Sequence, residues 1–330
     1  MAKKLENMSE APGHEDAEID VVSEVLGAVR LTTDVLGRFE LGAPWAFRSD
    51  RGGAVALYVM ARGSATLELL EKTRGMPSVF ALSAGDVAVL PHGAPHLLRD
   101  PGAGPRRALT SADLACRRGM QPGPTRFGGS GPVTSFVAGA FHFGAAPRSV
   151  LLESLPSVLH LVSGAVSMSP QAAATVQMIL AESAAPGPGS AMMMARLADI
   201  ILVHALRTQT CAAGKAHGGL CALADPSIGG ALRLIHARPA EPWTVYTMAA
   251  AVGMSRSAFA ARFSELVGES PLKYLTRWRM TQAAELLRDQ REPVARIAER
   301  VGYGNAAAFM KAFTRVQGMG PGEFRKTVGR

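Results

Sequence analysis

Two similar stretches in the last third of the chain constrain its fold most strongly. Residues 249–263 read AAAVGMSRSAFAARF, and residues 298–313 read AERVGYGNAAAFMKAF. In each, a short helical segment reaches Val-Gly, a residue suited to helix capping follows, and two phenylalanines four residues apart complete the pattern. Because side chains at i and i+4 share one face of a helix, each stretch predicts two short helices joined by a tight turn.

Each residue type at these turns has a physical role. Gly253 and Gly302 supply the left-handed backbone that ends a helix without steric cost. Ser255 and Asn305 then cap the next helix by accepting hydrogen bonds from its first amides. The phenylalanines that we expect to bury against the preceding helix are Phe259, Phe263, Phe309 and Phe313.

Between the two repeats, Ser270-Pro271 predicts the start of a long helix, because proline in a first turn loses no helical hydrogen bond. This helix is expected to hold the two units rigidly apart. The sequence predicts that its apolar side chains lie roughly on one face: Leu272, Leu275, Trp278, Ala283, Leu286 and Leu287.

The net charge is confined to the same part of the chain. Residues 226–330 contain 16 Lys and Arg against 8 Asp and Glu, so the whole formal net charge of +8 falls there. Basic charge segregated in this way favours a polyanion partner for that segment alone.

The stretches GMSRSAFAARF, PLKYLTRWRM and IAERVGYGNAAAFMKAFTRVQGMGPGEFR resemble the DNA-binding domain of the AraC/XylS family of bacterial transcription regulators. The resemblance implies two helix-turn-helix units that bind double-stranded promoter DNA, with RNA polymerase as a further partner. It also implies a cytoplasmic, nucleoid-associated protein. The resemblance suggests an activator, although the residues leave repression open as well.

The exposed side of the second helix of a helix-turn-helix enters the major groove. Arg256 is the strongest candidate for a base contact, whereas alanines meet thymine methyl groups but form no bidentate hydrogen bonds. The second unit is therefore expected to discriminate bases weakly. Predicted phosphate contacts are Arg262, Lys273, Arg277, Arg279, Lys311 and Arg315. The predicted DNA-binding residues are Arg256, Ser257, Ala260, Ala261, Arg262, Asn305, Ala306, Ala307, Met310 and Lys311.

Short alternating runs with glycine breaks, such as GGAVALYVMARGSATLELLEK and SVFALSAGDVAVLPHGAPHLL, predict antiparallel strands of a small barrel before residue 107. Gly85, Pro91, Gly93 and His96 follow the spacing of the second cupin motif, so this part resembles the cupin-type sensor domain of AraC-family regulators. The expected fold class is α+β.

Trp45, His92 and His96 are the candidate effector-binding residues. The strand LYVMARGSATLEL lacks the His-x-His of the first cupin motif, and two histidines alone make an incomplete metal site. A structural role, an effector-lining role and metal ligation all remain open for them. We expect no catalytic residue, metal or cofactor; the effector is unknown.

Residues 170–182 and 190–208 predict two helices, and the second, AMMMARLADIILVHALR, is unusually apolar. Its apolar side either packs on the barrel or forms a homodimer. We therefore expect a disordered tail at 1–20, a sensor and dimerisation domain at 21–209, a linker at 210–225 and a DNA-binding domain at 226–330. No apolar run is long enough for a bilayer, so no membrane partner is expected.

The leading hypothesis is a non-enzymatic transcription regulator that responds to a small molecule. A thiol-based redox regulator is the first alternative, because Cys116 lies beside two arginines that would lower its pKa, and Cys211 and Cys221 flank the linker. A cupin enzyme fused to a DNA-binding module is a second, and a purely architectural DNA binder is a weak third.

Overall fold

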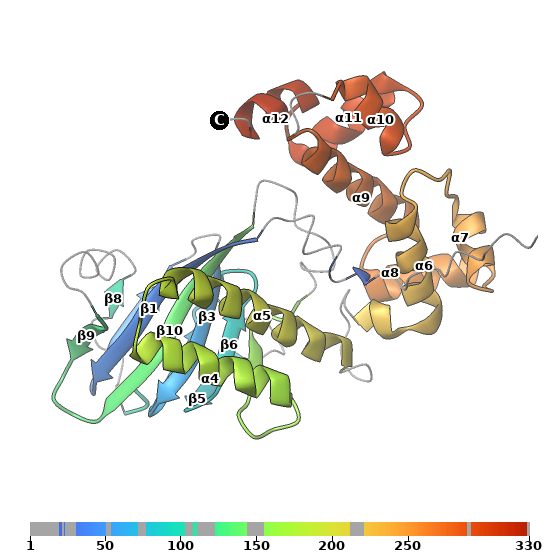
Figure 1. Cartoon of the computed structure of the whole chain (residues 1–330). Helices are drawn as coiled ribbons and strands as arrows, with labels where there is room; N and C mark the ends of the chain where they lie inside the picture. The colour runs from blue at the N-terminus through green and yellow to red at the C-terminus, as the bar shows by residue number, and fades with distance from the viewer. Residues whose placement is uncertain are drawn as a thin grey trace, which may run out of the picture.

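The chain forms a strand-rich N-terminal part and a helical C-terminal part (Figure 1). Residues 1–19 of the predicted tail at 1–20, and residues 212–220 of the predicted linker, lie outside the described residues. Within them, no helix is long and apolar enough to cross a membrane. The computed structural model describes residues 20–21, 23, 31–50, 54–71, 77–102, 108–110, 123–143, 155–211, 221–288 and 292–328.

The strands form two sheets, with the order β11-β6-β3-β10-β1-β9 in one and β5-β4-β7-β2-β8 in the other. Neighbouring strands are antiparallel, as predicted, except for the parallel pairs β1–β9 and β2–β8. The bounds are β1 Leu31–Gly42, β2 Ala46–Ser49, β3 Val55–Arg62, β4 Ser64–Leu69, β5 Val79–Ser83, β6 Val87–Leu90, β7 His96–Arg99, β8 Leu109–Thr110, β9 Thr125–Gly128, β10 Val133–Phe143 and β11 Leu159–Leu161.

The six-stranded sheet is buried on both faces, which explains why β3 is almost entirely apolar. Val55, Leu57 and Val59 belong to one apolar cluster with the helices, whereas Tyr58 and Met60 belong to another with the second sheet. Strand β4 of the second sheet instead alternates buried and more exposed residues, because only one of its faces meets a core. The N-terminal part therefore has three layers: sheet, sheet and helices.

The third layer is a hairpin of two helices, α4 (Pro170–Ala184) and α5 (Ser190–Cys211), close to the predicted bounds. Figure 1 shows the pair lying across the strands of the six-stranded sheet. Ser169 caps α4 by accepting from the Ala172 amide. The buried side of the hairpin, which includes Val176 and Ile201, completes the apolar cluster on this face.

The C-terminal helices confirm both predicted helix-turn-helix units. Gly253 and Gly302 have φ angles of +70° and +83°, and Ser255 and Asn305 accept hydrogen bonds from the first amides of the helices they cap. All four phenylalanines are fully buried. The bounds are η1 Cys221–Ala224, α6 Pro226–Ala237, α7 Val245–Ala251, α8 Arg256–Val267, α9 Pro271–Leu286, α10 Val294–Arg300, α11 Ala306–Gln317 and α12 Pro321–Val328.

The linker helix α9 buries two opposite faces, and the prediction of one apolar face was wrong. At about 100° per residue, the buried residues Pro271, Tyr274, Leu275 and Trp278 share one side of the helix, and the last three belong to the apolar cluster of the first unit. Leu272 lies about 100° away from that stripe and is 44% exposed. The residues buried with the second unit point to the opposite side: Met280, Ala283, Ala284 and Leu287.

A buried histidine joins α6 to the first face of α9. His236 Nε2 lies 2.7 Å from the Tyr274 hydroxyl, and its ring stacks on Trp278 at 3.9 Å between centroids. Burial lowers the pKa of His236 to about 3. The imidazole therefore remains neutral at physiological pH, which suits its apolar surroundings.

We predict that acid destabilises the protein through this histidine. Unfolded, His236 would titrate near pH 6.5, so between about pH 6.5 and 3 the unfolded chain binds one more proton than the folded chain. The free energy of unfolding therefore falls as the pH falls through this window, by about 2 kcal/mol at pH 5. Thermal unfolding of His236→Gln should show a smaller loss of stability from pH 7 to pH 5 than wild type. The control His142→Gln, at a half-exposed site, should keep the wild-type loss. Equal losses in all three proteins would contradict the prediction.

Candidate DNA-binding interface and effector pocket

The first recognition helix, α8, presents a short polar face to solvent. Burial of Phe259 and Phe263 turns its opposite side outward, where Arg256, Ser257 and Ala261 are exposed. Arg256 is the first residue of the helix, the end that reaches base edges in a major groove. Of the five residues predicted on α8, Ala260 is partly buried.

Arg262, also on α8, points its guanidinium at another helix. Its Nη2 and Nε lie 2.6 and 2.9 Å from Asp225 Oδ2. Asp225 also caps α6 by accepting from the Ser227 and Ile228 amides. Burial raises the pKa of Asp225, but the Ile228 amide and the Arg262 guanidinium outweigh it and hold that pKa below its usual value. The DNA contact predicted for Arg262 stays a prediction, and in this structure the side chain links two helices.

The second recognition helix, α11, presents a smaller and less polar face. Ala306, Ala307 and Lys311 are exposed, and Met310 is 48% exposed. Asn305 Oδ1 accepts from the Ala307 amide at 2.8 Å, so its side chain already serves as the cap of the helix. The face therefore offers apolar contacts and one ammonium group to a groove, and weak base discrimination stays a prediction.

The three residues predicted to bind an effector lie in the two-sheet core or beside it. Trp45 and His96 are 3% and 1% exposed. His96 Nδ1 lies 2.7 Å from the Ala94 carbonyl and therefore donates to it, leaving Nε2 to accept from the Tyr58 hydroxyl at 2.7 Å. His92 Nε2 donates to the Leu155 carbonyl at 2.8 Å. These hydrogen bonds occupy three of the four ring nitrogens, and effector binding by these residues stays a prediction.

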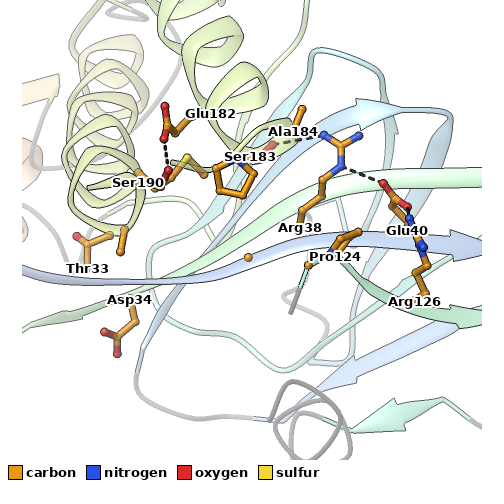
Figure 2. A pocket seen from close by; sticks show the side chains of 15 residues that line it. Thr33, Asp34, Arg38, Glu40, Pro124, Arg126, Glu182, Ser183, Ala184 and Ser190 are labelled. Atoms are coloured by element: carbon orange, nitrogen blue, oxygen red, sulfur yellow. Dashed lines mark hydrogen bonds and ion pairs between the residues drawn. The ribbon is translucent and has the colours of Figure 1, made fainter. Parts of the chain in front are cut away.

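A pocket of about 910 Å³ lies elsewhere, between the outer face of β1, the start of β9 and the turn that joins α4 to α5. The sequence analysis missed it, because its walls come from segments as far apart as residues 33 and 194. The one local sign of the pocket in the sequence is a pair of opposite charges two residues apart, Arg38 and Glu40. Figure 2 shows its polar side chains: Thr33, Asp34, Arg38, Glu40, Arg126, Glu182, Ser183 and Ser190.

The charges in this pocket are separated. On one side, Glu40 accepts from Arg38 Nε at 3.2 Å and from Arg126 Nε at 2.9 Å. The Arg126 guanidinium, together with that of Arg38, holds the pKa of Glu40 below its usual range. On the other side lies Glu182, which accepts from the Ser190 hydroxyl, whereas the Asp34 side chain points away across β1, where its Oδ2 lies 3.3 Å from His142 Nε2 (Figure 2). The first side therefore carries two guanidinium groups and one carboxylate, and the second carries the Glu182 carboxylate.

The cysteines of the redox alternative fall outside the described side chains. Cys116 lies in an undescribed segment, and the side chains of Cys211 and Cys221 are also undescribed. Their predicted roles are therefore untested. Among the described residues, no group of three or more His, Cys, Asp and Glu side chains could hold a metal ion.

Comparison with known proteins agrees with this architecture. A cupin model matches residues 20–211, and a helix-turn-helix domain model matches residues 248–327. The chain is 34% identical over 313 residues to an AraC-like transcription regulator of Streptomyces lividans, covering 93% of this chain and 98% of that protein. A similar regulator of Streptomyces antibioticus is 33% identical over 312 residues, covering 93% and 99%. The DNA-binding domain of AdpA, solved with a target DNA, is 32% identical over 31% of this chain and 92% of that one, with a TM-score of 0.30.

The chain therefore belongs to the AraC-like family of transcription regulators. The predicted function, DNA-binding transcriptional regulation by a protein with a cupin domain, is confirmed at this level.

Replacing Arg256 should weaken specific DNA binding. A lost base contact costs about 1–3 kcal/mol, so Arg256→Ala should lower affinity for a selected site by about 5- to 150-fold. The matched control is Arg48→Ala, which removes the same charge from the cupin domain, where Arg48 pairs with Asp50 at 2.8 Å. Fluorescence anisotropy with the full chain would measure both. Equal effects of the two substitutions would show that Arg256 does not meet the bases.

Proposed function

We propose that this regulator responds to a small molecule bound in the pocket between β1, β9 and the α4–α5 turn, and that helix α5 carries the response to the DNA-binding domain. The single observation that carries this proposal is the path of α5. Ser190, Ala191 and Met194, at its start, line the pocket. Ala205 and Leu206, near its end, are buried in an apolar cluster that also contains residues of α6 and α8.

The connection between α5 and the first recognition helix runs through η1. The elements α5, α6 and α8 each contact this short helix. Ala222 of η1 is fully buried among them, and Phe259 and Phe263 belong to the same cluster. A helix of 22 residues is about 33 Å long. A ligand that moves the first turn of α5 relative to β1 would therefore change how the far end of α5 packs, through η1, against α8. This change would shift the population of DNA-competent arrangements.

The chemistry of the pocket favours a ligand that carries both an anionic group and a protonated amine. The anionic group would meet Arg38 and Arg126, and the amine would meet Glu182. Alanine, proline and methionine side chains between these sides offer apolar contacts. The volume of about 910 Å³ lies within the range of small-molecule sites and accommodates a zwitterion as large as a short peptide.

This proposal predicts ligand binding that depends on both sides of the pocket. Free L-amino acids and dipeptides, with their N-acetylated and C-amidated forms, would be titrated into the full chain by calorimetry. At least one free zwitterion should bind, and Arg38→Met, Glu182→Gln or either blocking group should weaken it about tenfold or more. Arg48→Met, at an exposed arginine outside the pocket, is the control. Failure of every compound to bind, or equal binding by all variants, would overturn it.

We also propose that the regulator forms a homodimer through α5. Met193, Leu197, Ile200 and His204 follow the spacing i, i+4, i+7 and i+11, which places them in one stripe along the helix. Met193 and Ile200 are 52% and 45% exposed, and Leu197 and His204 are partly buried. The opposite side of α5, with Ile201 fully buried, packs on the six-stranded sheet. One side of α5 therefore packs within the domain, and the other side is the one that we propose for the dimer.

An acidic residue in this stripe should dissociate the dimer. In a two-fold interface each substitution acts twice, and a carboxylate buried without a partner is strongly unfavourable. Ile200→Glu should therefore raise the dimer dissociation constant, measured by analytical ultracentrifugation, by well over tenfold. Met178→Glu, on α4 and 55% exposed, is the matched control. A monomeric wild-type protein, or equal effects of both variants, would refute the interface.

The remaining parts of the proposal concern partners and chemistry. We infer that the cupin domain senses rather than catalyses, because Leu155, Ala94 and Tyr58 engage its two motif histidines. RNA polymerase is the proposed partner at promoters, in the cytoplasm. Metal analysis of the purified full chain tests the first point, since stoichiometric metal would favour an enzyme. Transcription of a promoter carrying a selected site, with and without the protein, tests the second.

A further inference from the structure

Arg279 lies at the boundary between the two faces of α9. The stripe that ends with Trp278 packs on the first helix-turn-helix unit, and the stripe that starts with Met280 packs on the second. The two stripes point in opposite directions, and at about 100° per residue Arg279 projects roughly midway between them. The two units have separate apolar clusters, so α9 joins them through its backbone and through whatever its side chains reach.

The guanidinium of Arg279 reaches both units. Its Nε donates to the Pro239 carbonyl at 2.7 Å, and its Nη2 donates to the Glu241 carbonyl at 2.8 Å. These carbonyls belong to the loop between α6 and α7, in the first unit. The carbon Cζ of the same guanidinium lies 5.7 Å from the ring centroid of Tyr303, in the turn of the second unit. The phosphate contact predicted for Arg279 stays a prediction, and in this structure its guanidinium makes these contacts within the protein.

The turns themselves approach each other closely at this point. A Cβ atom added at Gly302 would lie 2.7 Å from the Ala240 carbonyl oxygen and 2.8 Å from Arg279 Nη2. Such distances leave no room for a side chain, so Gly302 is required both for its positive φ and for this contact. The loop of the first unit, the guanidinium and the turn of the second unit thus form one continuous contact.

We propose that Arg279 is a positioning residue that sets the spacing of the DNA site by fixing the first helix-turn-helix unit against the second. The guanidinium is planar, donates to two carbonyls of the first unit and lies near the Tyr303 ring of the second unit. Its orientation is therefore fixed by both units. Without these contacts the two units are still connected by α9, but the guanidinium no longer holds the loop of the first unit against the turn of the second. The recognition helices α8 and α11 can then change their relative angle.

Rigid spacing has a measurable consequence for binding. Inserting one base pair between the segments read by α8 and α11 moves one segment by about 3.4 Å and turns it by about 35°. A rigid pair of units cannot follow both segments, so wild type should bind the altered site about tenfold or more weakly. A protein with a loosened pair should lose much less.

The test begins with the selection of DNA duplexes from a randomised pool by the full chain, which should yield two conserved blocks, one read by α8 and one by α11. Affinity is then measured on sites with one base pair inserted or removed between the two blocks. Arg279→Met should select the same two blocks with a broader range of spacings. Its penalty for the altered sites should fall to about threefold or less. Arg279→Lys, which keeps the charge but not the two-pronged donor geometry, should give an intermediate penalty and serves where Arg279→Met does not fold.

The control is Arg288→Met, which removes an arginine from the same region whose guanidinium pairs with Glu285 of α9 at 3.0 Å. It should keep the wild-type spacing preference. Thermal unfolding of each variant separates lost stability from changed spacing, since a purely structural role would lower affinity for all spacings alike. An unchanged spacing penalty in folded Arg279→Met and Arg279→Lys, or a single selected block for wild type, would overturn the proposal. No specific duplexes at all would instead contradict DNA binding itself.

Discussion

Docking of the α4–α5 hairpin on the six-stranded sheet is the contact on which the rest of the architecture depends. The sheet can bury β3, β6 and β10 on both faces only because the hairpin covers the side that the second sheet does not. Burying one large aliphatic side chain contributes about 1.5–3 kcal/mol, and this face contains many of them. The direction of α5, set by this contact, in turn determines where η1 and the first DNA-binding helices lie.

The two DNA-binding units share a local design but differ in their connections. Each has a glycine turn, a capped recognition helix and a buried phenylalanine pair. The first unit shares an apolar cluster with α5 and the sensor domain, whereas the second has a cluster of its own. In the proposed response, a signal from the cupin domain would therefore meet the first unit directly. It would reach the second through α9 and through contacts such as those of Arg279.

The features that the sequence predicted well are local ones. A glycine turn, a capping serine and phenylalanines at i and i+4 act within one or two helical turns, so Gly253, Ser255 and Phe259 could be assigned from their neighbours alone. The alternation of apolar and polar residues likewise predicted the strands. The surface position of Arg256 followed from the burial of Phe259 and Phe263.

The features that the sequence did not reveal depend on distant partners. The buried face changes along α9, and Leu272 is exposed as a result. The apolar residues of α9 do not by themselves show which of the two units each one contacts. The inward direction of Arg279 depends on carbonyls about 40 residues away. The pocket likewise joins β1 to a helix turn about 150 residues later. Side-chain type does not encode such pairings; they follow from the tertiary fold.

The guanidinium of Arg262 has two alternative partners, the Asp225 carboxylate that it pairs with in this structure and the DNA phosphate predicted for it. Asp225 stands directly after η1 and holds the first turn of α6, so the pair ties the junction of the two domains to a recognition helix. A phosphate that took Arg262 would leave Asp225 without its cation. Linkage is reciprocal, so any rearrangement of the junction that strengthens the pair would weaken a phosphate contact at Arg262 by the same free energy. The residue would then report the state of the sensor in the affinity for DNA, without any movement of the helix that carries it.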